Sequence, residues 1–230
     1  MQPTYIPWMG YFGLMMSVDL FVLLDSVQFS KRSWQQRNQI KSNSGPQWLT
    51  VPVHTKGKRD QLIVDVHIDL SREFHLSHIR ALEINYRKSI FFDEIFPLLK
   101  ETLLNPPETL LELNIRMIEL IRGLLGINTP LMRSSTLLAG GENALLLANI
   151  CLELGATEYI SPPGSRVYLD ETNIFEKIKI PVEYFDFQCL PYTQQFGEFL
   201  PFMSTVDLLF NCGSSGKDFI QKGITKKYDT

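Results

Sequence analysis

The 230-residue sequence predicts a single α/β domain with a mainly parallel sheet. Residues 20–25 form a short continuous apolar run that ends on Asp25, as buried parallel strands do. Between residues 142 and 187, helical and strand-like segments alternate, which again favours parallel pairing. A block of three predicted helices over residues 73–126 is interpreted as a helical insertion or layer beside this sheet.

The composition indicates a globular protein and argues against a nucleic-acid partner. Apolar residues make up 44% of the chain and charged residues 20%, which are ordinary values for a globular protein. The formal net charge of −3 argues against a nucleic-acid partner, because no overall positive field would attract phosphates. Basic clusters at residues 31–41 and 56–59 leave a local basic patch open, against the alternative of solvated turns.

Two further features concern the location of the protein. No apolar run reaches the ~18 residues of a membrane span, so we expect no membrane insertion. The three cysteines form no CxxC pair, which favours a reducing compartment, and we expect a cytoplasmic protein.

The first candidate site is the opening stretch, residues 2–12. Pro3 and Pro7 each fix φ and keep this stretch out of a helix, while Gly10 precedes an apolar run, 11–16, that we expect to be helical. In an open α/β sheet, ligands bind outside the carboxyl ends of the strands, where this stretch and the polar residues after the first strand should lie. The alternative is that the aromatic side chains here belong to the core.

No strand precedes this opening stretch, although an α/β domain normally has a strand that leads into such a loop. We therefore expect either that the chain as given starts late or that a first strand is missing.

The middle of the chain predicts a hairpin and then helices. Residues 48–53 predict an edge strand because Pro52 cannot donate to a ladder, and residues 62–69 alternate with period two. We expect these two strands to pair across the turn at 56–59. Helices are predicted at residues 73–88, 91–104 and 108–125.

The last hundred residues predict alternating elements. Strands are expected at residues 130–135, 157–161 and 180–187. Helices are expected at residues 142–154, 171–177 and 204–210.

The second candidate site is residues 161–168, where a predicted strand leads into Pro-Pro-Gly-Ser-Arg. Gly164 allows close backbone approach, and Arg166 can pair with a phosphate or carboxylate, so we interpret the segment as an anion clamp. The alternative is a surface turn.

The third candidate cluster is Asp25, Gln28, Lys31 and Arg32. Its carboxylate could hold a hydroxyl, an amine or a hydrated Mg²⁺, and its cations could neutralise phosphate. The alternative is a polar loop at the end of the sheet. His75 and His78 lie three residues apart, but no acidic or cysteine motif completes a metal site, so we predict none.

Several motifs together resemble those of the WbqC-like family. They are the opening Gln2-Pro3-x-Tyr5-x-Pro7-x-x-Gly10-Tyr11-Phe12, residues 19–29, residues 159–169, and residues 207–213 with Asp207 and Asn211. The resemblance extends over the whole chain. This family is encoded largely in bacterial surface-polysaccharide and O-antigen gene clusters, and its members have a suggested role as glycine or aminoacyl transferases that act on sugars.

A more distant resemblance is to pantothenate synthetases, which adenylate a carboxylate and pass it to an amine. Residues 8–11, 25–29 and 165–169 stand where those enzymes have their His-x-Gly-His loop, their Val-Asn-Pro-x-Gln-Phe strand end and their Ser-Ser-Arg-Asn-x-Tyr-Leu motif. This resemblance implies a Rossmann-like, HUP-type fold. The chain departs from the pattern at Trp8 and Tyr11, which replace the two histidines of the nucleotide loop.

The function implied is an acyl- or aminoacyl-transferase that forms an amide on an amino sugar. ATP with Mg²⁺, or an acyl-CoA, is the suspected donor system, and the partners implied are a nucleotide-linked amino sugar and a small carboxylate or acyl donor. Homo-oligomerisation is left open. The alternatives are a non-catalytic nucleotide-sugar-binding protein and a protein–protein adaptor.

Each candidate residue has a provisional role in this hypothesis. Catalysis is assigned to Asp25 and Gln28, which would orient the acceptor amine, and to Tyr11, which can donate a hydrogen bond. Residues proposed to bind nucleotide or phosphate are Gln2, Tyr5, Gly10, Gly164, Ser165, Arg166 and Tyr168. Residues proposed to bind substrate are Lys31, Arg32, Arg37, Asn38, Asp207 and Asn211.

Overall fold

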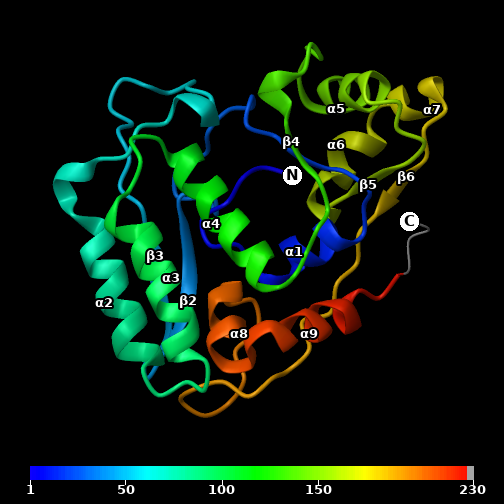
Figure 1. Ribbon diagram of the computed structural model, residues 1–230. Coiled ribbons are helices and arrows are strands. Elements are labelled where there is room, and N and C mark those ends of the chain that lie inside the picture. Colours follow the sequence, from blue (N-terminus) through cyan, green and yellow to red (C-terminus); the bar gives the residue numbers. More distant parts are fainter. Residues whose placement is uncertain (227–230) are drawn as a thin grey trace.

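The computed structural model describes residues 1–226 and has a mixed α/β architecture (Figure 1). The described part holds two parallel strand pairs and one antiparallel pair. In the parallel pairs, β1 (Phe21–Leu23) lies beside β4 (Leu131–Arg133), and β5 (Tyr159–Ser161) lies beside β6 (Val182–Tyr184). The four predicted strands at these positions and their parallel pairing are confirmed. They form two separate pairs, whereas the sequence predicted one sheet.

The predicted helix after the opening stretch is confirmed as α1 (Met9–Met16). A β-carbon added at Gly10 would lie 2.2 Å from the Trp8 ring, so the glycine leaves room for the indole over the start of the helix. Trp8 packs against Phe187 and Phe202 with ring centroids 5.5 Å apart in each case. These contacts fix the start of α1 against the C-terminal part of the chain.

The predicted hairpin between residues 48–53 and 62–69 is wrong. The partner of β3 (Gly45–Thr50) is β2 (Arg37–Ser42), and the two strands are joined by a tight turn in which Gly45 has φ +99°. Only an isolated bridge, Val53 to Ile68, connects the segments that were predicted to pair.

Residues 62–69 do not form a strand, because the segment begins with a 3₁₀ turn that buries two residues three positions apart. Ile63 and Val66 are both fully buried, and the 3₁₀ turn η1 (Ile63–Asp65) puts them on the same side. A second 3₁₀ turn, η2 (Leu70–Arg72), follows directly.

The three helices predicted between residues 73 and 126 are confirmed as α2 (Phe74–Tyr86), α3 (Phe92–Leu104) and α4 (Leu110–Leu124). Thr109 caps α4 by accepting a hydrogen bond from the backbone N–H of Glu112, 3.3 Å away. The apolar face of α4 is fully buried, including Leu113 and Met117. In Figure 1, α4 and α1 lie between the α2–α3 pair and the β5–β6 region.

The segment between residues 143 and 184 is built on a second apolar cluster. Helices α5 (Asn143–Glu153) and α7 (Ile174–Ile178) pack together and, with α6 (Arg166–Asp170), contribute most of its buried residues. These residues are Ala144, Leu147, Ala148, Cys151, Leu169, Phe175 and Ile180. The helices predicted at residues 142–154 and 171–177 are confirmed, the second with shifted bounds, while α6 was not predicted because five residues show no helical period.

The predicted helix at residues 204–210 is confirmed as α8 (Thr205–Cys212). It is followed by the 3₁₀ turn η5 (Gly213–Ser215) and by α9 (Gly216–Gly223), which was not predicted. Across residues 1–226, no helix combines the length and the apolar character that a bilayer span requires.

Candidate functional site

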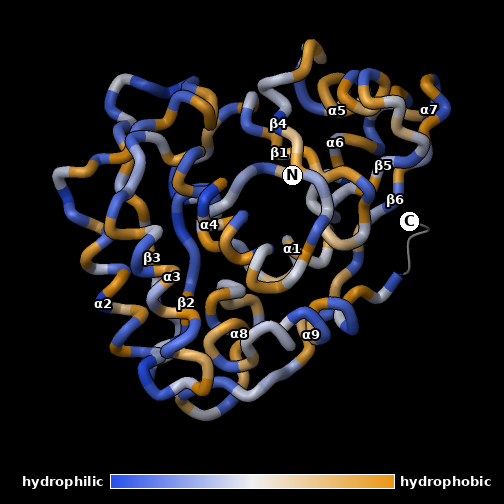
Figure 2. Tube along the Cα trace, viewed as in Figure 1, coloured by the Kyte–Doolittle hydropathy of each residue, from blue (hydrophilic) through white to orange (hydrophobic). Residues whose placement is uncertain are grey.

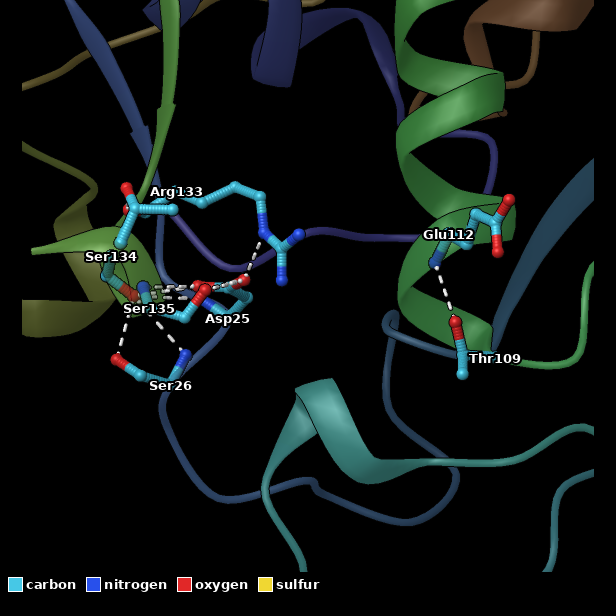
Figure 3. Close-up of polar contacts among 8 residues, drawn as sticks. Asp25, Ser26, Thr109, Glu112, Arg133, Ser134 and Ser135 are labelled. Carbon is cyan, nitrogen blue, oxygen red and sulfur yellow. Dashed lines mark hydrogen bonds and ion pairs between the residues drawn. The ribbon is translucent and has the colours of Figure 1, made fainter.

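The carboxyl ends of β1 and β4 meet at a polar cluster (Figure 3). Asp25 follows β1 by two residues, and Arg133 is the last residue of β4. Ser134 and Ser135 begin the 3₁₀ turn η3 (Ser134–Thr136). Because the two strands are parallel and Leu23 pairs with Arg133, these side chains lie at the same edge.

Asp25 is fully buried, and its carboxylate accepts four hydrogen bonds. Arg133 Nε donates to Oδ2 across 2.6 Å, and Ser135 Oγ donates to the same oxygen across 2.7 Å. The Ser135 backbone N–H and the Ser134 hydroxyl donate to Oδ1 across 2.8 Å and 3.1 Å. Burial alone raises the pKa of Asp25, but the hydrogen bonds from Ser135 and Arg133 outweigh it and lower this pKa.

These contacts decide what Asp25 can do. A carboxylate with a lowered pKa and four donors around it is a poor general base, since a base must be free to accept a proton. Asp25 instead holds the start of η3 and the Arg133 side chain in place. It is a positioning residue.

Arg133 extends from this cluster to the surface. Its side chain is 40% exposed, and only Nε is used in the ion pair with Asp25. Within the described part of the chain, its two terminal nitrogens make no hydrogen bond, and Figure 3 draws the contact with Asp25 at Nε. A guanidinium oriented in this way can bind a phosphate or a carboxylate through two parallel hydrogen bonds.

The second predicted site lies at the carboxyl end of β5. Ser165 is buried, and its hydroxyl contacts that of Ser161 and donates to the Pro162 carbonyl across 2.7 Å. Arg166 is exposed and lies over the Tyr184 ring, 4.3 Å from its centroid. Gly164 and Tyr168 both lie at the surface. The segment thus presents one cation and several polar groups beside the end of a parallel strand.

The fold separates Asp25 from the other three residues of the third predicted cluster, Gln28, Lys31 and Arg32. Gln28 is exposed, and its amide donates to the Arg59 carbonyl and to Asp60 across 3.3 Å and 3.2 Å. With Lys31, it lines a shallow basic hollow that also contains Lys58 and Arg59. Asp25 is buried at the ends of β1 and β4, whereas Gln28 lies at the surface. The two side chains therefore do not belong to the same site. Arg32, also exposed, adopts φ +58° and donates its backbone N–H to Gln36.

The opening stretch is held by two buried amides. Asn38 Nδ2 donates to the carbonyls of Ile6 and Tyr5 across 2.8 Å and 3.3 Å, and Asn114 Nδ2 donates to that of Pro3 across 3.2 Å. Gln2 is exposed, and its side-chain oxygen accepts a hydrogen bond from Gln35 across 2.8 Å. Of the opening residues predicted to bind a ligand, Gln2 is the one at the surface.

The aromatic residues of this stretch lie in the core. The Tyr5 hydroxyl contacts His78 Nδ1 at 2.8 Å, and Tyr11 packs against Phe12 and Phe21. Both tyrosines are 1% exposed, and burial raises their pKa. The Tyr11 hydroxyl is buried without a hydrogen bond in the described residues. This environment fits the core alternative for both rings.

The remaining predicted substrate-binding residues have structural contacts. Asp207 is fully buried and accepts hydrogen bonds from the hydroxyls of Tyr86 and Tyr192, across 2.7 Å and 2.8 Å. Asn211 donates to the Asp207 carbonyl across 2.8 Å. Arg37 lies over the Trp48 ring, 4.3 Å from its centroid.

The comparisons with known proteins identify the group to which this chain belongs. The sequence profile of the WbqC-like protein family matches residues 2–219. The chain belongs to the WbqC-like family. This confirms the resemblance inferred from the sequence motifs. A relative from Mycobacterium tuberculosis, named "Uncharacterized protein Rv1507c", is 40% identical over 222 residues, which cover 96% of this chain and 95% of the relative. No solved structure matches.

In this WbqC-like protein, sequence reasoning missed Arg133, Ser134 and Ser135. The available signal was the Arg-Ser-Ser sequence at the end of the strand predicted at residues 130–135, next to a strand that ends on a carboxylate. For residues 1–226, no group of three or more histidine, cysteine, aspartate or glutamate side chains is arranged to hold a metal ion.

Proposed function

We propose that this WbqC-like protein is an acyl- or aminoacyl-transferase that forms an amide on an amino sugar in the assembly of bacterial surface polysaccharide. The observation that supports this most is Arg133, a half-exposed guanidinium anchored on buried Asp25 at the carboxyl ends of two parallel strands. Its free nitrogens suit a phosphate of a nucleotide-linked sugar or of an activated acyl donor, or a free carboxylate.

The two parallel pairs also fit a finer version of the fold. We propose that β4–β1 and β5–β6 are the two halves of a Rossmann-like, HUP-type sheet. In such sheets the ligand lies outside the carboxyl ends of the strands. One half ends at Asp25 and Arg133, and the other ends at Ser161.

Roles for this chain's residues follow from their surroundings. Arg133 binds an anionic group of the donor or acceptor, and Asp25 holds Arg133 in position. The second polar edge, at the end of β5, consists of Gly164, Ser165, Arg166 and Tyr168. Gln2 is the exposed residue that the opening stretch contributes. The basic hollow with Gln28 and Lys31 offers a separate place for phosphate.

The proposed reaction joins the sugar amine to the acyl carbonyl carbon. A C–N bond forms, the bond from that carbon to its leaving group breaks, and the amine releases a proton. If ATP with Mg²⁺ activates the carboxylate, a carboxylate oxygen first bonds to the α-phosphorus and pyrophosphate leaves, so AMP is the group that the amine then displaces. If the donor is an acyl-CoA, the amine displaces the CoA thiolate. In both routes the amine proton passes to solvent or to the departing group. Asp25 is not proposed as the base, because its oxygens are occupied by donors.

The test is a product assay with purified protein and a nucleotide-linked amino sugar. One arm adds glycine and MgATP, another adds an acyl-CoA, and mass spectrometry looks for the amide. We expect product in one arm, and a loss of roughly a hundredfold in rate for Arg133→Met. Arg72→Met is the matched control, because Arg72 is exposed and, among residues 1–226, its side chain pairs with Asp69 alone.

Two results would contradict the proposal. Absence of amide in every arm, with an Arg133-dependent thermal shift on adding the nucleotide sugar, would favour the non-catalytic binding protein. Equal product formation by wild type and Arg133→Met would show that the reaction does not use this site.

A further inference from the structure

A groove of about 340 Å³ lies between the two parallel strand pairs. Residues 20–22 and Leu24 line one side of it, and residues 157–160 line the other, so β1 and β5 face each other across the groove. Leu147 and Ile150 of α5 line it too, as does Leu14 of α1. Figure 1 shows the N-terminus between β4 and β5, and Met1 itself lines the groove.

Met1 already pairs with β1 as a strand residue would. Its amino group donates to the Val22 carbonyl across 2.8 Å, and its carbonyl accepts from the Leu24 N–H across 2.9 Å. A residue of a parallel strand makes these two bonds, since it bridges two alternate residues of its neighbour. Met1 is therefore the last rung of a parallel ladder whose earlier rungs would lie in the groove.

The facing strand edges have unused pairing capacity. Phe21 N–H donates to Pro130 on the β4 side, and strand residues alternate in direction, so the N–H of Val22 faces the groove. On β5, Tyr159 N–H donates to Pro181 and Ser161 C=O accepts from Phe185, which puts the backbone groups of Ile160 on the groove side. Edges of this kind are templates for another strand.

We propose that this groove accepts a further β-strand, parallel to β1 and supplied by a segment joined directly to the nitrogen of Met1. Met1 sits opposite Leu23, and lining residues 19–22 come before that rung, so the strand would contribute about four residues. It would be apolar on both faces, because α5 and α1 cover the groove from two sides. It would join β4–β1 and β5–β6 into one sheet.

Continuity with Met1 distinguishes this occupant from a separate peptide. The ladder runs directly into Met1, so a detached peptide would place its terminal carboxylate against the Met1 amino group and interrupt the rung. Burial lowers the pKa of this amino group to about 5. A peptide nitrogen at the same place would carry no charge and would avoid that desolvation cost.

The test extends the chain by a Val-Ile-Val-Ile segment after a new initiator methionine and before Met1. We expect the melting temperature to rise by roughly 5 °C or more, since each kcal/mol is worth about 2–4 °C in a domain of this size. Hydrogen exchange should slow in peptides covering residues 19–24 and 157–161. Two matched controls have the same length, one with Ser-Gly-Ser-Gly and one with a proline in the second position before Met1, whose N–H should face β1.

The possible results of this experiment either support or contradict the proposal. A rise with the apolar extension alone, with slower exchange on both β1 and β5, supports the proposal. An unchanged melting temperature and unchanged exchange, or an equal rise with Ser-Gly-Ser-Gly, overturns it. If a free Ile-Val-Ile peptide added to the unextended chain gives the same protection as the extension, the occupant is a separate strand and the proposal is wrong. These readouts measure stability and do not depend on transferase activity.

Discussion

Arg133 Nε lies 2.6 Å from the carboxylate of Asp25, and this contact joins residues 108 positions apart in the sequence. It ties the carboxyl end of β4 to that of β1. Asp25 is buried, whereas the Arg133 side chain remains 40% exposed. The ion pair and the ligand binding that we propose would thus use different atoms of one side chain.

Asp25→Asn should weaken this edge of the protein. An amide has one oxygen, so it cannot accept from all four donors, and its NH₂ group would face a donor of Arg133 or Ser135. We expect the free energy of unfolding to fall by about 2 kcal/mol. Urea denaturation at neutral pH measures the change, with the exposed Asp65→Asn as the control. Equal effects in the two variants would contradict the buried network.

Tyr86→Phe should be costly, while Tyr11→Phe should not. The Tyr86 hydroxyl accepts from the backbone N–H of Lys41 across 3.0 Å and donates to Asp207 across 2.7 Å. Its removal leaves two buried groups without this partner, and we expect a loss of about 2–3 kcal/mol.

Tyr11→Phe is the matched control for that variant. Its hydroxyl is buried without a hydrogen bond in the described part of the chain, so its removal should leave the unfolding free energy unchanged or raise it. Both variants are compared by urea denaturation. A large loss in Tyr11→Phe would mean that this hydroxyl has a partner in solution.

The sequence predicted the parallel strands and most helices because their signals are local. Residues 20–25 are a continuous apolar run, and α4 follows a threonine cap with an apolar face. The antiparallel pair could not be predicted in this way. Figure 2 shows β2 as mostly hydrophilic, yet Asn38 and Lys41 are buried. Their side chains depend on distant partners. Asn38 donates to the opening loop, and Lys41 Nζ donates to the carbonyls of Gly197 and Glu198.

Only the part of the candidate site that has a local signal in the sequence was predicted. Asp25 was recognised because it ends a strand, whereas the importance of Arg133 arises only when β4 lies beside β1. Gln28 was grouped with Asp25 because the two are three residues apart. The chain turns between them, so that Asp25 is buried and Gln28 is exposed in the basic hollow.

Asp207 predicts a pH dependence of stability. Burial raises its pKa, with hydrogen bonds from Tyr86 and Tyr192 opposing this effect. The folded state then holds a proton that the unfolded state has released, so stability falls as pH rises from the ordinary carboxyl pKa to the raised one. Asp25 has a lowered pKa, so its stabilisation is complete above the ordinary carboxyl pKa and is lost only as pH falls through the lowered value.

The measurement is a series of urea denaturations between about pH 4 and pH 8. We expect Asp207→Asn to lose the decline of stability with rising pH just above pH 4 that the wild type shows. Asp65→Asn should keep that decline, since Asp65 is exposed. Parallel pH profiles for wild type and Asp207→Asn would contradict the raised pKa.

Gly10→Ala and Gly123→Ala should have opposite effects. The new β-carbon at Gly10 would lie 2.2 Å from the Trp8 ring, which cannot move freely because it packs between Phe187 and Phe202. We expect a loss of about 2 kcal/mol from this overpacking. Gly123 lies on the exposed side of α4 with open space around it, so alanine there should stabilise the helix by up to ~1 kcal/mol. Thermal and urea denaturation of the two variants test the pair, and a stable Gly10→Ala would mean that the indole has another place to pack.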